Sequence, residues 1–234
     1  MRQPLLVEYF QSLPERSEGE APESWAVRLQ EALDKFKFEV ANRYNEGSLQ
    51  RILVHADDDS RKAAILALSL IGTMSSNKVL AARLQHENPQ VRQMAGQALW
   101  ALWFRADTED HNRELQRLMA PQGPAQALAG LDALIARAPR FAEAYNQRAI
   151  LHFRQGQLQK AIADCDHVIR INPWHFGAHA GMGQCYLKLK KHRAALRSFR
   201  NALRINPDMK GVEQAIRSLE ESLGEEGRKD DRNR

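Results

Sequence analysis

Hydrophobic residues recur at helical spacing along most of the chain, and the apolar–polar alternation of strands is missing. The first long run begins after Ser24, and its apolar members lie three or four residues apart: Trp25, Leu29, Ala32, Leu33, Phe36, Val40 and Tyr44. This spacing places side chains on one face of an α-helix. Aromatic residues make up only 7% of the sequence, while alanine and leucine are abundant. We therefore predict an all-α fold.

The ends of the first elements are predicted from turn-forming and capping residues. A short helix is expected within residues 1–13, with its apolar residues on one side: Leu5, Leu6, Tyr9, Phe10 and Leu13. Residues 14–22 are acidic and rich in turn formers, which predicts a linker. Ser24 is the expected N-cap of the long helix, Gly47 its end, and Ser48 the N-cap of the helix that follows.

A repeat with a period of 31 residues covers residues 48–103. Its first copy contains Leu49, Leu53, His55, Arg61, Ala64, Ala67 and Leu68. Its second copy contains Leu80, Leu84, His86, Arg92, Ala95, Ala98 and Leu99. Asp57 and Asn88 are expected N-caps, and Pro89 occupies a first helical position.

The phrase Asn88-Pro89-Gln90-Val91-Arg92, followed by the three small and apolar residues of the second copy, resembles HEAT repeats. The resemblance includes the short bacterial kind that also occurs in phycobilin lyases. In that family the matching arginines tie neighbouring turns together. The resemblance therefore implies structural roles for Arg61 and Arg92.

A second period, of 34 residues, follows. Pro139, Pro173 and Pro207 mark it, the last two within the phrase Ile-Asn-Pro. Paired helical patterns lie between the prolines, so each interval predicts one helical hairpin of a stacked array. The second interval has a small residue, Gly183, where two helices of a hairpin must approach closely, and Gly156 supplies the inter-helix turn of the first. Lys190 stands at that turn in the second interval and predicts a strained or differently shaped connection.

These intervals resemble tetratricopeptide (TPR) repeats. The better copy carries the family's small, aromatic and turn residues at Gly183, Tyr186, Ala195, Phe199, Ala202 and Pro207. The preceding copy has Ala149, His152, Ala161, Cys165, Val168 and Pro173 at those places. A degenerate copy is expected upstream, capped by Thr108 and with Ala127, Leu131 and Leu134 in its second helix. Residues 209–223 are expected to form a closing helix.

The combination looks like bacterial HEAT–TPR hybrid proteins, and it predicts an α-solenoid with four parts. Residues 1–23 form an N-terminal segment and linker, and residues 24–105 form the HEAT-like array. Residues 106–223 form the TPR array with its capping helix, and residues 224–234 form a charged, disordered tail.

The TPR resemblance implies binding of a protein or peptide, because the first helix of each hairpin lines the concave face of such arrays. The residues expected to be exposed there are Asn112, Arg113, Gln116, Asn146, Gln147, Ile150, Arg154, Gln184, Lys188 and Gln214. Amides both donate and accept hydrogen bonds, so a row of them suits an extended peptide backbone. The clamp for chaperone C-terminal carboxylates is not reproduced, since Gly177, Ala180 and Gly181 replace some of its polar groups. The other interpretation is an ordinary solvated face.

The charge pattern supports an alternative function. The chain has 34 basic and 29 acidic residues, and four arginines share one helical face: Arg193, Arg197, Arg200 and Arg204. This basic patch suits nucleic acid, anionic lipid or an acidic protein. The alternative function is therefore that of a nucleic-acid-associated or anionic-surface-binding protein. It also fits a solvated face, because no aromatic residues interleave with the arginines.

Enzymatic chemistry is disfavoured, including the lyase-like HEAT alternative. His175 and His179 have ligand spacing but no completing acid or cysteine, so core or surface histidines are expected rather than a metal site. Asp57, Asp58 and Asp59 suit helix capping better than calcium binding. The glycines between residues 177 and 183 lack the context of a phosphate loop. No catalytic residue, cofactor or metal is predicted.

Three further features bear on packing and location. The aromatic residues Trp100, Trp103 and Phe104 suit either a pocket or the joint where the arrays pack. Cys165 and Cys185 suit reduced core thiols. The chain has neither a secretory signal pattern nor an apolar run long enough for a bilayer, so a cytoplasmic location without membrane insertion is expected. The partner's identity and the oligomeric state are left open.

Overall fold

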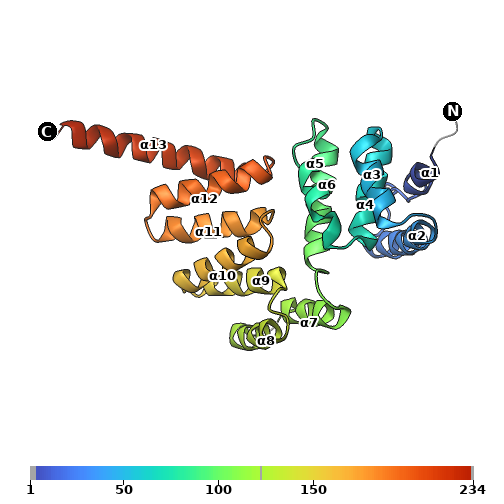
Figure 1. The fold of residues 1–234 in the computed structure, drawn as a ribbon, viewed down its shortest axis with the longest axis horizontal. Helices are drawn as coiled ribbons and strands as arrows, with labels where there is room; N and C mark the ends of the chain where they lie inside the picture. The colour runs from blue at the N-terminus through green and yellow to red at the C-terminus, as the bar shows by residue number, and fades with distance from the viewer. Residues whose placement is uncertain (1–3, 122, 233–234) are drawn as a thin grey trace. The chain divides into compact units, whose positions relative to one another are not determined.

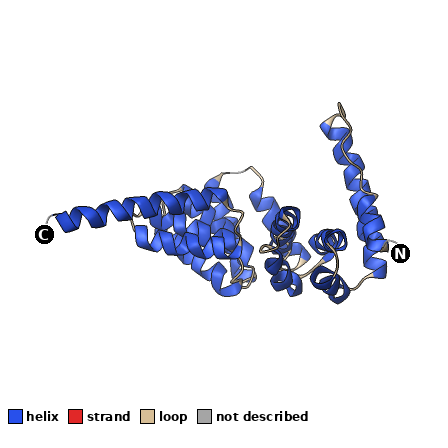
Figure 2. Cartoon of the chain, turned by 90° about the horizontal axis from the view of Figure 1, so that it is seen from above, coloured by secondary structure: helices blue, strands red, loops and turns tan. Residues whose placement is uncertain are grey.

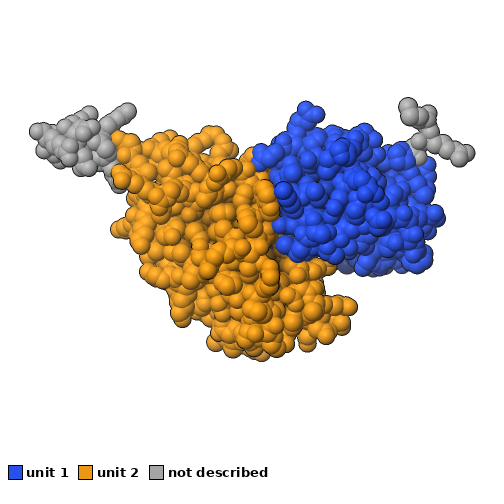
Figure 3. Space-filling view, in the orientation of Figure 1, with its two compact units in different colours: residues 1–102 blue, residues 103–234 orange. Residues whose placement is uncertain are grey.

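A computed structural model describes residues 4–121 and 123–232 of the chain, with side chains described up to residue 224. Every regular element in these ranges is a helix, and no strand occurs among them, as Figure 2 shows. The predicted all-α class is confirmed, with consecutive hairpins stacked as in an α-solenoid. The chain divides into two compact units, residues 1–102 and residues 103–234 (Figure 3).

The first unit contains α1 Leu5–Gln11, α2 Pro22–Arg43, α3 Glu46–His55, α4 Asp58–Ile71, the 3₁₀ helix η1 Met74–Ser76, α5 Asn77–Arg83 and α6 Pro89–Trp103, whose last residue belongs to the second unit. The predicted caps at Asp57 and Asn88 are confirmed. Asp57 accepts hydrogen bonds from the backbone N–H groups of Asp59 and Ser60. Asn88 accepts one from that of Gln90.

Three expected helix boundaries in this unit are wrong. Helix α2 begins at Pro22 rather than after Ser24, because the fixed φ of proline suits a first helical position. It ends at Arg43, before Gly47. Asn45 rather than Ser48 caps α3, since its side-chain oxygen lies 2.8 Å from the Ser48 nitrogen.

The apolar face of α1 agrees with the prediction at Leu6, Tyr9 and Phe10, which are buried or half-buried, and differs at Leu5 and Val7. Leu6 and Val7 are buried, whereas Leu5 is exposed. Val7 rather than Leu5 therefore completes the buried face of this helix.

The repeated arginines of the first unit are structural, as predicted. Arg61 donates to the carbonyl oxygens of Leu53 and Ala56 at 3.1 and 2.6 Å. Arg92 donates to those of His86 and Glu87 at 2.9 and 3.0 Å. The Arg61 guanidinium thus satisfies carbonyl groups at the end of α3, and that of Arg92 satisfies carbonyl groups of the loop that follows α5.

The second unit contains α7 Glu109–Met119, α8 Pro124–Arg137, α9 Ala142–Arg154, α10 Leu158–Ile171, α11 Phe176–Lys188, α12 His192–Ile205 and α13 Lys210–Arg232. Each helix from α7 onward contacts the next one in the chain, and Figure 1 shows them in that order. Thr108 caps α7 as predicted. The three repeat prolines lie in the turns before α9, α11 and α13.

The inter-helix turns of the two good hairpins have the same shape. Gly156 has φ +74°, and Lys190 has φ +57°. The N–H of the next residue in each case reaches back to close the turn, from Gln157 to His152 and from Lys191 to Tyr186. The expectation of a differently shaped turn is therefore wrong, while the strain of a left-handed lysine is present.

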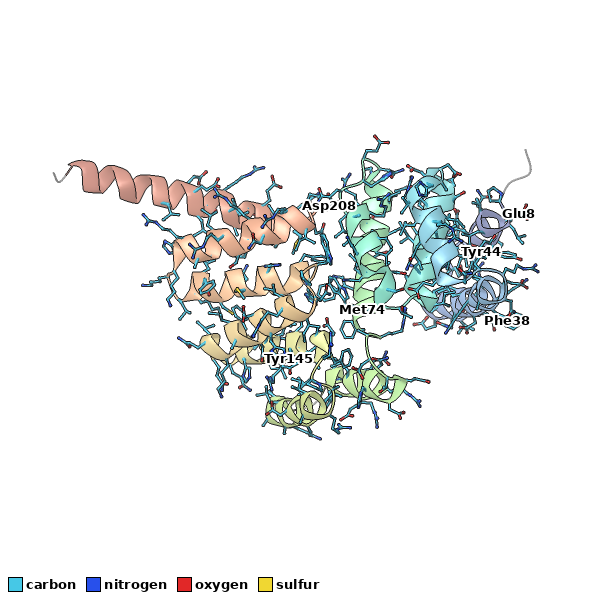
Figure 4. All side chains as sticks on the ribbon, viewed as in Figure 1. Glu8, Phe38, Tyr44, Met74, Tyr145 and Asp208 are labelled. Carbon is cyan, nitrogen blue, oxygen red and sulfur yellow. The ribbon has the colours of Figure 1, made fainter. Side chains whose placement is uncertain are left out.

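Arg148 links three successive helices of the second unit. Its guanidinium lies 2.7 Å from the Asp132 carboxylate on α8 and 2.6 Å from that of Asp164 on α10. It also lies over the ring of Tyr145, which Figure 4 labels. The hydrogen bond with Asp164 is the main reason that the pKa of Arg148 is raised.

The closing helix is longer than predicted. Its buried residues Val212, Ile216 and Leu219 pack with Phe199 and Ala202 of α12, as a terminal cap should. However, α13 continues to Arg232. The expected disordered tail from residue 224 is therefore helical backbone here, and its last two residues lie outside the described ranges.

The close approach at Gly183 generates a stability prediction. A Cβ atom added there would lie 2.5 Å from two ring carbons of Phe199, which is fully buried. Because the ring has no free space to retreat into, we expect Gly183→Ala to destabilise the protein by about 1–3 kcal/mol. Urea unfolding followed by circular dichroism measures this. Gly211→Ala is the matched control, since nothing lies within 4 Å of its added Cβ. An equal response of the two variants would contradict the packing described here.

Candidate functional site

The first helices of the two good hairpins, α9 and α11, contact each other and form the face on which binding residues were predicted. The two halves of α9 differ. Residues 142–147 are all buried, whereas Ile150 and Arg154 are exposed. The N-terminal half of this face is therefore closed and the C-terminal half is open.

A buried carboxyl group organises the closed half. Glu143 is fully buried, and its oxygens accept hydrogen bonds from Asn146 Nδ2 at 3.0 Å, Gln147 Nε2 at 2.5 Å and His175 Nε2 at 3.1 Å. The expectation that Asn146 and Gln147 are exposed is wrong, because burial of an acid requires donors and these amides supply them. Sequence reasoning gave Glu143 no role.

His175 connects this cluster to the start of α11. Its Nδ1 accepts a hydrogen bond from the Ala178 N–H at 3.0 Å and so caps the helix. These hydrogen bonds place the ring proton on Nε2, which faces Glu143. Trp103 stacks on the imidazole with a centroid distance of 4.1 Å, and it also contacts Phe176. His175 is thus a buried structural residue, the interpretation that the sequence favoured.

A pocket of about 370 Å³ lies beside the exposed end of α9, between this helix and the hairpin of α7 and α8. Its lining is mainly apolar, with Leu118 and Met119 from α7, Ala127 from α8 and Ile150 and Leu151 from α9. Gln147, Arg154 and Gln155 supply its polar groups. Met119 is 45% exposed and Ile150 is 36% exposed. The arrangement suits an apolar side chain bordered by a cation.

Most other residues of the predicted groove are exposed, as expected: Arg113, Gln116, Gln184, Lys188 and Gln214. Arg113 pairs with Glu109 and Asp110 on its own helix. Asn112 differs, because it is half-buried and its amide bonds both to the backbone N–H and to the carbonyl of Asp107. Since Asn112 and Asn146 both serve internal hydrogen bonds, the predicted row of free amides is not continuous.

The basic patch on α12 is exposed at all four arginines but is partly compensated. Arg200 lies 2.6 Å from the Glu220 carboxylate on α13. Arg204 donates to the side chain of Asn201. Arg193 and Arg197 have no ion-pair partner among the described residues. These two arginines lie in the N-terminal half of α12.

Other candidates for reactive chemistry serve the fold. Asp58 bonds to Asn88 and Arg61, and Asp59 pairs with Lys62. Burial lowers the pKa of His179. Within the described ranges, no three His, Cys, Asp or Glu side chains are grouped for metal binding. No helix there is long and apolar enough to cross a bilayer.

Comparison with known proteins identifies both repeat types. The model for HEAT repeats matches residues 45–135, and that for tetratricopeptide repeats matches residues 142–175 and 177–209. The chain therefore carries HEAT repeats followed by tetratricopeptide repeats. The HEAT match includes α7 and α8, which we predicted as a degenerate TPR hairpin. These helices pack in one core with Phe141, Ala149 and Val168 of the TPR region.

A TPR repeat-containing protein of Rhizobium etli is 35% identical over 42% of this chain and 48% of its own length. The mouse Superkiller complex protein 3 is 30% identical over 35% of this chain and 5% of its own. The chain thus spans less than half the length of these relatives.

Among solved structures, a thermophilic TPR protein of Thermus thermophilus matches at 18% identity with a TM-score of 0.39, over 84% of this chain and 91% of its own. YrrB, a TPR protein with an unusual peptide-binding site, matches at 19% identity with a TM-score of 0.41, over 84% of this chain and 98% of its own.

The cluster around Glu143 generates a prediction about stability. Glu143→Ala removes the acceptor of three buried donors, so we expect a loss of at least about 2 kcal/mol in the free energy of unfolding. Urea denaturation measures it. Asp166→Ala is the control, because the Asp166–Arg170 pair is exposed and such pairs contribute less than about 1 kcal/mol. A loss no larger than that of the control would show that Glu143 does not hold the cluster together.

The two cysteines generate a prediction about reactivity. Burial raises the pKa of Cys165 to about 12 and that of Cys185 to about 11. Because the thiolate is the reactive form, we expect iodoacetamide to label neither cysteine appreciably at pH 8 in the folded protein. The unfolded thiols ionise near pH ~8.5, so labelling in urea should be rapid. Between pH ~8.5 and the raised pKa values of about 11 and 12, the unfolded state releases thiol protons that the folded state retains. Rising pH in this range therefore lowers the free energy of unfolding. Mass spectrometry of the alkylated protein measures both rates, and equal rates would contradict the burial.

Proposed function

We propose that this protein is a non-enzymatic scaffold that holds a segment of a protein partner on the α9–α11 face. The observation that carries the proposal is the apolar pocket of about 370 Å³ at the open end of α9. Residues predicted from the TPR pattern to line a peptide groove border it, namely Gln147, Ile150 and Arg154. A partner's apolar side chain would bury the exposed parts of Ile150 and Met119.

The side chains with reactive potential support the non-enzymatic part of this proposal. Glu143 and His175 are fully buried and hydrogen-bonded to each other. Both cysteines are buried with raised pKa values. General acid–base or nucleophilic catalysis requires such groups to reach a substrate.

Binding of nucleic acid through the basic patch is the weaker alternative. Phosphate binding gains from several uncompensated cations in one area. The Arg200–Glu220 pair reduces that field in the patch. The pocket on α9, by contrast, combines apolar lining with exposed contact area, which suits a protein side chain.

Binding at the pocket is tested with the double variant Ile150→Ser/Met119→Ser. Tagged full-length protein recovers partners from the native host, and the affinity of an identified partner is then measured by calorimetry. Burial of one such side chain stabilises by about 1.5–3 kcal/mol, so we expect binding to weaken roughly tenfold to a hundredfold. Circular dichroism checks that the fold is retained.

Val27→Ser/Phe38→Ser is the matched control, because these residues of α2 are 60% and 67% exposed. It should leave the affinity unchanged. Loss of binding in this control with full retention in the pocket variant would place the interface on α2 instead.

A further inference from the structure

The helices of the α9–α11 face present positive charge without negative charge. Glu143 is the only acidic residue of α9, and it is fully buried. Helix α11 contains no acidic residue. Both helices end in an exposed cation, Arg154 and Lys188, and the 34-residue period gives these two the same place in their hairpins. The open half of the face therefore attracts acidic groups.

The Lys188 side chain reaches from α11 to the end of α9. Lys188 Nζ lies 4.2 Å from the ring centroid of Phe153, the residue that precedes Arg154. This cation–π contact directs the ammonium from α11 toward the end of α9. Neither Arg154 nor Lys188 has an acidic partner among the described residues. Two exposed cations without acidic partners, at the ends of α9 and α11, attract acidic side chains of a ligand.

Arg154 also lines the apolar pocket, so an apolar contact and a charge contact are available at one site. We propose that the partner segment is an internal, extended stretch with one apolar residue in the pocket and nearby acidic side chains that pair with Arg154 and Lys188. This inference rests on the proposed function and specifies the chemistry of its ligand. Packed helices lie about 8–10 Å apart, and an extended chain advances about 3.3 Å per residue. Because alternate side chains of an extended chain lie on the same side, acidic residues two positions apart, about 7 Å, suit the two cations.

Side-chain carboxylates fit this face better than a free C-terminus. A terminal carboxylate that is bound together with its backbone gains from amide donors beside the cations. The donors of Asn146 and Gln147 are occupied by Glu143. Single-stranded nucleic acid fits less well, because it requires exposed aromatic rings for base stacking. The Phe153 ring is covered by Lys188, and Tyr145 is buried and stacked on His167.

The test uses a library of random twelve-residue peptides displayed on phage, each within a flexible linker so that neither end is free. Selection on the full-length protein should enrich peptides with an apolar residue and two acids two positions apart. The best peptide is then synthesised with blocked ends, and its affinity is measured by fluorescence anisotropy. We expect Arg154→Glu/Lys188→Glu to weaken binding at least tenfold.

Arg193→Glu/Arg197→Glu is the matched control, since it changes the net charge equally at exposed positions of α12. It should change the affinity less than twofold. The neutral variant Arg154→Gln/Lys188→Gln should also weaken binding, which separates loss of attraction from introduced repulsion. Equal losses in the two charge-reversed variants would overturn the inference, because only total charge would then matter.

The remaining outcomes separate this inference from the proposed function. Enrichment of peptides without acidic residues would overturn the charge recognition and leave the pocket as a binding site. Binding restricted to a second library with free C-termini would show that a terminal carboxylate is the ligand and would overturn the proposal for an internal segment. Tighter binding of a single-stranded oligonucleotide than of any peptide, lost in Arg154→Glu/Lys188→Glu, would overturn it in favour of nucleic acid. Absence of any enriched peptide would overturn the proposed function itself.

Discussion

The burial of one acidic side chain determines what the α9–α11 face offers to a ligand. An acid in the protein interior requires donors, because it has lost its hydration. Glu143 meets this requirement with two amides and an imidazole. Those groups are then committed to the fold and are not available for a ligand backbone. In the proposed function, recognition falls to the next turns of α9, where Ile150 and Arg154 reach solvent.

The hairpin architecture follows from regularities in the sequence because its causes are local or recur with the repeat period. The prolines recur in the turns between hairpins, and Gly183 meets the ring of Phe199 where the two helices of its hairpin approach each other. The same holds for Arg61 and Arg92, which satisfy carbonyl groups within their own repeats. Individual helix starts are less regular. Helix α2 begins at Pro22 rather than after Ser24, and Asn45 rather than Ser48 caps α3. The sequence offers residues suited to a helix start at both places, so it does not select one of them.

The candidate site was predicted only in part. The exposed residues of the groove follow from their place on a helix, and the pocket falls among them. The burial of Asn146 and Gln147 depends on Glu143 and, through it, on His175. The 32 residues that separate this pair do not equal the repeat period, so comparison of the copies does not connect them. The cation–π contact between Lys188 and Phe153 likewise depends on rotamers that a periodic pattern does not specify.

The neighbour-to-neighbour order of contacts in the second unit has a consequence for motion. From α7 to α13, each helix contacts the next one in the chain, and residues far apart in this series contribute little to each other. Stability in such an array is a sum of local terms, so opening is graded rather than all-or-none. Helix α13 has a neighbour on one side, whereas α9 and α10 have neighbours on both. Amide hydrogens of α9 and α10 should accordingly exchange with solvent most slowly, so that the helix proposed to bind the partner belongs to the most rigid part of this unit.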